Sequence, residues 1–384
     1  MPPNTMKCCV CNSERVVRLG PVGTKPGAVT SDSALIQHAA IVWRCTDCGH
    51  LQKLHNEDDW RVIGEIYNHY AGHRLSGGRE QLVFPPGLAP RPRSYHALEQ
   101  CRPRLPARGV LLDYGAGDGA VLKSAGKLLP DWQLHALDIT DKFREEILRL
   151  PGVVAFTSGE PAQLPAKHFD LIVLWHTLEH VPEPSNMLRT FHQWLKPEGQ
   201  VLIQVPDVAR NPYDLGVMDH VSHFTNATLR LCARSAKFEI AADGHVWTHN
   251  CLTLLLGRPE LVTETAPEPR TVAASSNPFE WLNAQLQFFV ERVGNGSYSI
   301  FGTGMASLLL AAQLPGTPHC FLDEDDRRAG GKINGIPILH PRELRETMPI
   351  IMPFLAETSD AIVKRLTAQI PVLKAELFII ARGT

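Results

Sequence analysis

The feature that most constrains this chain is the stretch RGVLLDYGAGD at residues 108–118. Its apolar run at residues 110–112 predicts a buried parallel strand. Alternate glycines at 115, 117 and 119 follow, before a helical pattern begins at Ala120. Glycines at such a turn let the backbone approach a ligand closely, and the helix behind them presents unpaired N–H groups. The stretch therefore predicts a nucleotide cradle in an α/β fold.

A second predicted strand supplies the residue that would hold a ribose. It covers residues 133–137 and ends in Asp138. A carboxylate about twenty residues past such a glycine turn typically accepts both ribose hydroxyls. These two features fit either NAD or an S-adenosyl compound, because both contain a ribose.

The segment at residues 164–207, which contains FDLIVLWHTLEHV and LKPEG, distinguishes between these ligands. It resembles the second half of a class I S-adenosylmethionine (SAM) methyltransferase, with DYGAGDG as that family's first motif. The resemblance covers roughly residues 110–238, and its motifs occur in the family's order. It implies that SAM is the cofactor and that its binding residues are Asp113, Gly115, Ala116, Gly117, Asp138, Ile139, Glu160, Trp175 and His176. Glu160 would accept the exocyclic amine of adenine or would be a solvated loop carboxylate.

Composition and charge narrow the remaining possibilities. A chain of 384 residues with 44% hydrophobic residues can form two or three domains. The chain has 38 Lys and Arg residues and 40 Asp and Glu residues. This balance of charge argues against a general nucleic-acid binder, which usually carries a basic excess. No apolar run approaches the roughly twenty residues of a membrane span, and residues 1–10 have no signal-peptide core. We therefore expect a soluble cytoplasmic protein whose cysteines stay reduced or bind metal.

Two CxxC pairs near the start of the chain predict a zinc ribbon. Cys8 and Cys11 form the first pair, and Cys45 and Cys48 form the second. Two-residue spacing lets both sulfurs of a pair face one ion, and four thiolates complete a tetrahedral site. No position is left open for water, so the ion would be structural and would fold a module too small to hold itself. The alternative is a set of unconnected thiols, as we expect for Cys9.

The segment that follows is expected to lack regular structure. Residues 63–78, IGEIYNHYAGHRLSGG, are polar, aromatic and rich in glycine, which favours either an exposed loop or a lid over the substrate that includes Tyr70. Residues 85–94 predict a stiff, extended Pro-rich connector, and helical spacing resumes at residues 95–101.

Two groups of polar residues are candidates for catalysis. His176, Glu179 and His180 follow the predicted strand at residues 169–175, at the edge where open α/β sheets bind ligands. Glu179 fits a capping or supporting position better than a substrate contact, whereas His180 is the better candidate for touching substrate.

The second group lies in DLGVMDHVSHFT, residues 214–225, where Asp219, His220 and His223 fall within five positions. A histidine near neutral pKa is the usual group that frees a nucleophile for methylation, and Asp219 could orient the ring of His220. The alternative is that these residues cap the helix predicted at residues 226–233 and pack in a domain interface.

The whole chain resembles the nucleotide-sugar C-methyltransferases, which build the branched deoxysugars of antibiotics. The resemblance implies a zinc-binding module with a substrate lid at residues 1–80, a SAM domain at 81–258, a linker at 259–278 and a Rossmann-like domain at 279–384. In that family, a histidine removes a proton next to a keto group, and the resulting enolate takes the methyl group in line.

The family's residues carry over onto this sequence with two departures. His220 matches the base, His180 matches the histidine of the LEHV stretch, and Tyr70 matches the lid tyrosine. Asp219 replaces a glutamate, and Val217 replaces a tyrosine whose hydroxyl could hydrogen-bond the enolate oxygen. These departures leave O-methylation of a sugar or another small metabolite open.

The last third of the chain opens with a second glycine turn, GTGMAS at residues 302–307, and a predicted strand at 318–322 ends at Asp323. The third glycine of a dinucleotide motif is missing, which argues against NAD. The resemblance suggests instead that this domain helps to enclose the nucleotide-sugar, and Gly302 and Gly304 either approach its phosphates or form a purely structural turn.

Two further classes of function fit parts of this sequence. An RNA methyltransferase that grips nucleic acid through its zinc ribbon is opposed by the acidic Glu57, Asp58 and Asp59 near the second CxxC pair. A non-catalytic scaffold with a vestigial SAM site is the other. We expect a small-molecule substrate, no membrane partner, and a monomer or a homodimer.

Overall fold

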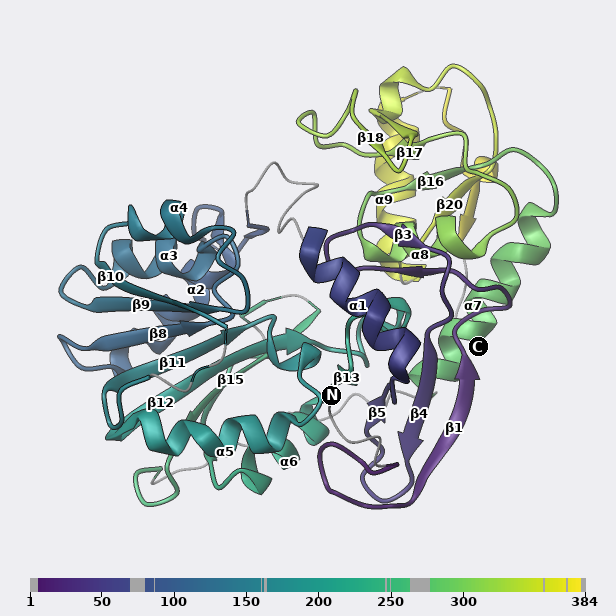
Figure 1. The fold of residues 1–384 in the computed structure, drawn as a ribbon. Coiled ribbons are helices and arrows are strands. Elements are labelled where there is room, and N and C mark those ends of the chain that lie inside the picture. The colour runs from purple at the N-terminus through teal and green to yellow at the C-terminus, as the bar shows by residue number, and fades with distance from the viewer. Residues whose placement is uncertain are drawn as a thin grey trace.

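The structure is a computed structural model that describes residues 6–69, 80–85, 87–159, 161, 164–245, 247–248, 250–262, 277–354, 356–370 and 372–380. These residues form three larger sheets and two small two-stranded ones (Figure 1). Of the helices that it describes, none is both long and apolar enough to cross a membrane.

The central sheet has seven strands in the order β10-β9-β8-β11-β12-β15-β14. The first five are parallel, and β15 runs antiparallel to both of its neighbours. Their bounds are β8 Val110–Tyr114, β9 Gln133–Asp138, β10 Val153–Ser158, β11 Phe169–Trp175, β12 Leu195–Pro206, β14 Glu239–Asp243 and β15 Cys251–Gly257.

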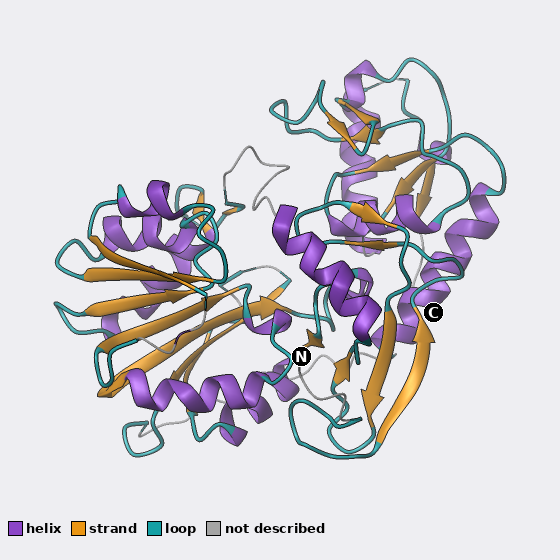
Figure 2. Cartoon of the chain, viewed as in Figure 1, coloured by secondary structure: helices purple, strands orange, loops and turns teal. Residues whose placement is uncertain are grey.

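Helices cover both faces of this sheet (Figure 2). Strand β11 is apolar on both sides, as a buried parallel strand must be. Leu171 and Val173 belong to one buried cluster, and Ile172 and Leu174 belong to the other. The helices of this region are α2 Arg93–Cys101, α3 Ala120–Leu128, α4 Arg144–Leu148, α5 Pro184–Trp194 and α6 Asn226–Ser235.

The amino-terminal module is an antiparallel sheet that the central domain completes. Its order is β1-β4-β5-β13, with β1 Val16–Pro21, β4 Ile41–Cys45, β5 Leu51–Gln52 and β13 Ser222–His223. A second hairpin joins β2 Ala28–Val29 to β3 Leu35–Ile36, and Val29 bridges to Val217. The module is therefore joined to residues 217–223 by strand pairing.

The expectation of a loop over residues 63–78 was wrong for its first part, because α1 spans Glu57–His69. Asn56 and Asp59 exchange reciprocal side-chain to backbone hydrogen bonds of 2.9 and 3.0 Å, which cap the helix start. Ile63 and Ile66, three residues apart, bury one face. The aromatic composition of this segment hid that short apolar spacing. Residues 70–79 lie outside the described residues.

The Pro-rich connector also differs from its expected extended form. Strand β6 (Leu82–Val83) pairs with β7 (Arg91–Pro92), and α2 follows at once. Pro92 precedes the first helical residue, where proline is well tolerated.

The carboxyl-terminal sheet has the order β18-β19-β17-β16-β20-β21, parallel from β19 onward. Its strands are β16 Ser299–Phe301, β17 Phe321–Leu322, β18 Lys332–Ile333, β19 Ile336–Leu339, β20 Ile350–Met352 and β21 Phe378–Ile380. Its helices are α7 Pro278–Val293, α8 Met305–Gln313 and α9 Ala356–Gln369.

One apolar core joins the amino-terminal module to the carboxyl-terminal sheet. It contains Val29, Val217, Leu309 and Ile351, which come from four separate parts of the chain. Gly216 lies against this core, since a Cβ there would come within 2.4 Å of Leu309. Helix α1 lies between the central and carboxyl-terminal sheets (Figure 1).

Candidate functional site

The glycine turn after β8 has the conformation that its sequence predicts. Gly115 and Gly117 both have positive φ, at 84° and 51°, which favours glycine over other residues. A Cβ on Gly115 would lie 2.4 Å from Thr177, whereas one on Gly117 would meet no atom within 4 Å. The turn is thus closed toward Thr177 and open beside Gly117.

Asp138 closes this turn from the neighbouring strand. Its Oδ2 accepts the backbone N–H of Gly117 at 2.8 Å, and its Oδ1 accepts that of Thr140 at 3.0 Å. Ile139 beside it is 69% exposed. Glu160, the expected adenine contact, lies outside the described residues.

Asp113 near the end of β8 is a buried carboxyl group that has no hydrogen-bond partner among the described residues. It is 1% exposed, and neither oxygen is bonded by any described residue. Burial and the nearby charge of Asp138 raise its pKa well above the usual value. An orphaned buried carboxyl group fits a site that receives a cationic ligand.

Trp175 and His176 continue this wall at the end of β11. Trp175 donates its Nε1–H to Oε1 of Glu80 at 3.1 Å. His176 has a φ of 53°, a strained value for a residue with a Cβ, and its Nδ1 lies 3.1 Å from Oε1 of Glu179. Glu179 is fully buried and supports His176, as expected for a supporting position.

The second polar group gathers around Asp214, which the sequence did not single out. Its Oδ1 lies 2.7 Å from Nδ1 of His220, and its Oδ2 lies 2.6 Å from Nδ1 of His223. Asp214 and both histidines are at most 7% exposed. One carboxylate therefore holds two imidazole rings.

Asp219 does not take the place beside His220 that the sequence suggested. Ser31 donates both its backbone N–H and its hydroxyl to the Asp219 carboxylate, whose Oδ2 lies 3.5 Å from Nδ1 of His180. Residues 217–220 form a turn closed by a hydrogen bond from the His220 N–H to the Val217 oxygen, and the side chains of Asp219 and His220 have different partners: Asp219 serves His180, while Asp214 serves His220.

His180 connects the two groups. Its Nδ1 lies 2.9 Å from the backbone oxygen of Asp219 and 3.2 Å from the hydroxyl of Tyr67 on α1. Its ring meets that of His220 edge to face, with centroids 4.7 Å apart. One polar atom each from Glu179, His180 and His220 lies within 4.8 Å of the others. Tyr70, the expected lid residue, lies outside the described residues.

Electrostatics fix the protonation of this cluster. Burial opposes a charge on His220, but the charge of Asp214 and its hydrogen bond outweigh burial and raise the pKa of His220. Burial also opposes ionisation of Asp214, yet His220 and His223 hold its pKa below the usual range. Burial and the charge of Lys53 lower the pKa of His223 to about 4. At neutral pH, Asp214 is ionised and a neutral His223 donates to it.

Sequence reasoning also missed Lys53, which is 2% exposed. Its Nζ donates to the backbone oxygens of Val217 and His220, the latter at 2.9 Å. Lysine after a short strand carries no pattern of its own, and Val217 is 164 positions away.

The four cysteines of the amino-terminal module converge. Sγ of Cys8 lies 3.6 Å from that of Cys48, and Sγ of Cys11 lies 3.6 Å from that of Cys45. All four sulfurs lie within 4.8 Å of one another. A tetrahedral zinc ion with Zn–S bonds of about 2.3 Å places its sulfurs about 3.8 Å apart. The residues present therefore fit such an ion. Cys9 points away, toward Ser222.

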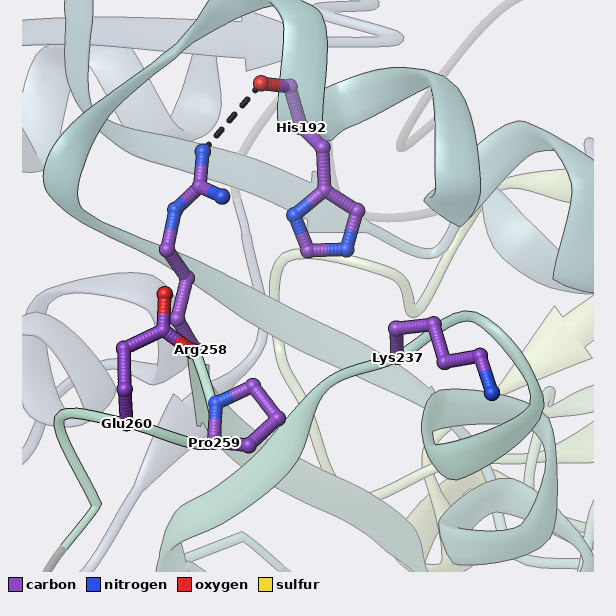
Figure 3. A pocket seen from close by; sticks show the side chains of 5 residues that line it. All are labelled: His192, Lys237, Arg258, Pro259 and Glu260. Atoms are coloured by element: carbon purple, nitrogen blue, oxygen red, sulfur yellow. Dashed lines mark hydrogen bonds between the residues drawn. The ribbon is translucent and has the colours of Figure 1, made fainter.

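A pocket elsewhere on the central domain is lined by His192, Lys237, Arg258, Pro259 and Glu260 (Figure 3). Arg258 donates to the backbone oxygen of His192 at 3.2 Å. These residues flank the far end of β15, whereas the glycine turn and the histidines lie at the carboxyl ends of the parallel strands. The pocket is thus separate from the polar cluster.

Comparison with known proteins identifies the class of the central domain. Residues 89–242 match the model of a family described as a methyltransferase domain. The glycine turn, the seven-stranded mixed sheet and this match define a class I SAM-dependent methyltransferase domain.

Curated relatives match the same region. The chain is 31% identical over 121 residues to the release factor glutamine methyltransferase of Koribacter versatilis, covering 29% of this chain and 43% of that protein. It is 38% identical over 82 residues to the ubiquinone biosynthesis O-methyltransferase of Pseudomonas syringae, covering 21% of this chain and 30% of that protein. The chain thus spans less than half the length of these relatives.

One similar solved structure is the Burkholderia thailandensis 1,6-didemethyltoxoflavin-N1-methyltransferase with bound 1,6-didemethyltoxoflavin and S-adenosylhomocysteine. It is 18% identical, with a TM-score of 0.40, and covers 56% of this chain and 97% of that one. A SAM-dependent methyltransferase from Aquifex aeolicus is 19% identical, with a TM-score of 0.37, over 50% of this chain and 97% of that one.

Proposed function

We propose that this protein is a SAM-dependent methyltransferase that methylates a carbon atom of a nucleotide-linked keto-deoxysugar, with His220 as the base. The observation that carries the proposal is the buried pairing of His220 with Asp214, at 2.7 Å, beside a methyltransferase cofactor cradle. The resemblance of the whole chain to nucleotide-sugar C-methyltransferases supports the substrate class.

The cradle residues fit SAM. The orphaned carboxyl group of Asp113 would receive the amino group of the methionine part, and Asp138 would accept the ribose hydroxyls. The exposed side chain of Ile139 would pack against adenine, with Glu160 at the exocyclic amine. When bound, SAM supplies an electrophilic methyl group.

His220 would supply the proton transfer. Because its Nδ1 is engaged by Asp214, its Nε2 is the ring nitrogen left to accept a proton from the carbon next to the keto group. Asp214 would then stabilise the imidazolium that forms, since the raised pKa of His220 reflects this same pairing. His180, supported by Asp219, would contact the substrate beside it.

The other parts of the chain would complete the site. The four-cysteine cluster would hold a structural zinc ion. The carboxyl-terminal domain, which we infer to be Rossmann-like from its parallel sheet, would enclose the nucleotide around the turn at Gly302, and Tyr70 would belong to a lid.

O-methylation of a sugar or another small metabolite is the second candidate. Val217 presents no hydroxyl to an enolate oxygen, and a His220–Asp214 pair could equally deprotonate a substrate hydroxyl.

One experiment separates these two candidates. Thermal stabilisation by S-adenosylhomocysteine with a panel of dTDP-, GDP- and CDP-sugars would first identify the ligand, because a ligand of the folded form raises apparent stability. Exchange of a substrate C–H with D2O in the presence of S-adenosylhomocysteine would then support C-methylation. His220→Asn should abolish that exchange and keep SAM binding. An intact enzyme that methylates the sugar without any exchange would favour the oxygen. No heat with SAM or its demethylated product, in calorimetry on the metal-loaded protein, would overturn both.

A further inference from the structure

The proposed base, His220, lies two residues before a strand of the cysteine module's sheet. Ser222 and His223 of β13 pair with Gln52 and Leu51 of β5. Strand β5 in turn pairs with β4, which ends in Cys45. Residues 46–50, a short turn that contains Cys48, separate the two strands. One small sheet therefore connects the cysteine cluster, through Cys45 of β4, with the segment that follows His220, through β13.

Lys53 follows β5 directly and makes three hydrogen bonds to the base's own turn. Its backbone N–H donates to the oxygen of Val221 at 2.8 Å. Its ammonium group donates to the backbone oxygens of Val217 and His220. Val217 and His220 are the first and last residues of the turn at residues 217–220, and Val221 follows that turn directly.

The burial of this ammonium group needs an explanation. A buried charge costs several kcal/mol unless it is well paired, and an apolar side chain of similar length would avoid that cost. No carboxylate within the described parts of the chain forms an ion pair with Lys53; the charges of Asp214 and Asp219 act on it from further away. Burial lowers its pKa to about 8, so it remains mostly charged at neutral pH. The two carbonyl oxygens are its direct partners.

We propose that Lys53 is a positioning residue for His220. The amino-terminal module with the four-cysteine cluster holds Lys53 in position, because Lys53 directly follows its strand β5. The ammonium group fixes the turn at residues 217–220, so that the ring of His220 stays on Asp214 and presents Nε2 to the substrate. At 2% exposure, Lys53 acts through the backbone of the base rather than on the substrate. The inference rests on the proposed role of His220.

The test compares Lys53→Met and Lys53→Arg with a matched control, Lys25→Met. Lys25 also donates its ammonium group to a backbone oxygen, that of Leu314, but at the contact with the carboxyl-terminal domain. All variants are used as full-length, metal-loaded protein. Displacing a reacting group by about 1 Å costs on the order of 100-fold in rate. We therefore expect Lys53→Met to lose about 10- to 100-fold in kcat, with SAM affinity and KM unchanged. Lys53→Arg should recover part of this loss, and Lys25→Met should keep the full rate.

A second readout needs no substrate. In protein labelled with 15N-histidine, the ring of His220, assigned with His220→Asn, should titrate at lower pH in Lys53→Met, because the ring moves away from Asp214, whose charge is the largest influence that raises its pKa. Loss of the Lys53 charge acts in the opposite direction, so a lower titration reports the movement of the ring. Unchanged kcat and an unchanged His220 titration in a folded Lys53→Met protein would overturn the inference. If Lys53→Met does not fold, Lys53→Arg decides: a lower kcat than that of Lys25→Met together with a shifted His220 titration would count as support, and a kcat and a His220 titration equal to those of Lys25→Met would count against it. A wild-type protein that methylates no keto-sugar would refute the proposed function, while the ring titration would still decide the role of Lys53.

Discussion

Asp214 and His220, six positions apart in the sequence, form a buried hydrogen bond of 2.7 Å between Oδ1 and Nδ1. The second oxygen of Asp214 is held by a neutral His223, so the carboxylate cannot turn away from His220. This pairing makes the acid–base properties of the site depend on one aspartate.

Replacing this aspartate should change both rate and pH dependence. Asp214 raises the pKa of His220, and the base works in its neutral form, so activity should rise with pH through that raised pKa. Asp214→Asn should shift this rise to lower pH and lower the maximal rate by about 100-fold or more. Steady-state kinetics from about pH 5 to about pH 9, the range in which imidazoles titrate, would measure both effects. Asp326→Asn, whose side chain is 92% exposed, is the control; an Asp214→Asn profile that coincides with it would contradict the assignment.

Asp113 should control cofactor affinity through a proton. Burial raises its pKa, so the carboxyl group tends to be protonated before a ligand binds. A cationic amino group placed beside it would favour ionisation, and the proton would be released. The enthalpy of SAM binding, measured by calorimetry, should therefore depend on the ionisation enthalpy of the buffer. Asp113→Asn should bind SAM about 10- to 100-fold more weakly, the usual worth of a charged hydrogen bond. The exposed Asp131→Asn serves as the comparison, and buffer-independent enthalpies in the wild-type protein would rule the coupling out.

His223 should make the fold sensitive to acid. Its folded pKa of about 4 lies below the usual 6.5, so the unfolded chain takes up the proton first. The free energy of unfolding should fall as pH drops from 6.5 toward 4, by at most about 3 kcal/mol from this residue. His223→Asn keeps a donor to Asp214 but cannot titrate, so its loss of stability over this range should be smaller. Urea denaturation at both ends of the range measures the difference, and parallel losses in the two proteins would disprove it.

Removal of metal from the cysteine cluster should destabilise more than the module that contains it. The sheet of β4 and β5 continues into β13, so a loosened cluster should release the stretch around His220. Chelation, or Cys48→Ser, should lower the melting temperature together with the zinc content and abolish methyl transfer. Cys9→Ser should retain one metal ion, because its sulfur lies beside Ser222 and outside the cluster. Unaltered melting of metal-free protein would show that the cluster is not a folding site.

Local patterns predicted the scaffold of the cofactor site well. The apolar run of β11 and the glycine turn before Ala120 are visible in sequence because strand burial and tight turns leave short-range signatures. The parallel pairing of β8 with β9 brings Asp138 beside Gly117.

The contacts of His220 were not predictable in the same way. Asp219 was the nearest carboxylate in sequence, yet the turn directs it to His180 and Ser31. Lys53 reaches His220, 167 positions away in the chain, only because β5 and β13 pair. Such partners depend on tertiary packing, which leaves no periodic trace.

The apolar core that joins Val29, Val217 and Leu309 has a consequence for dissecting this protein. A truncated chain that ended before α7 would expose the apolar residues that pack against Leu309, including Val217, to solvent. The carboxyl-terminal third therefore covers apolar residues of the segment that leads to His220. Fragments made by cutting within residues 259–278 should aggregate and be inactive. Heating the intact chain should melt the amino-terminal and carboxyl-terminal parts in a single cooperative step.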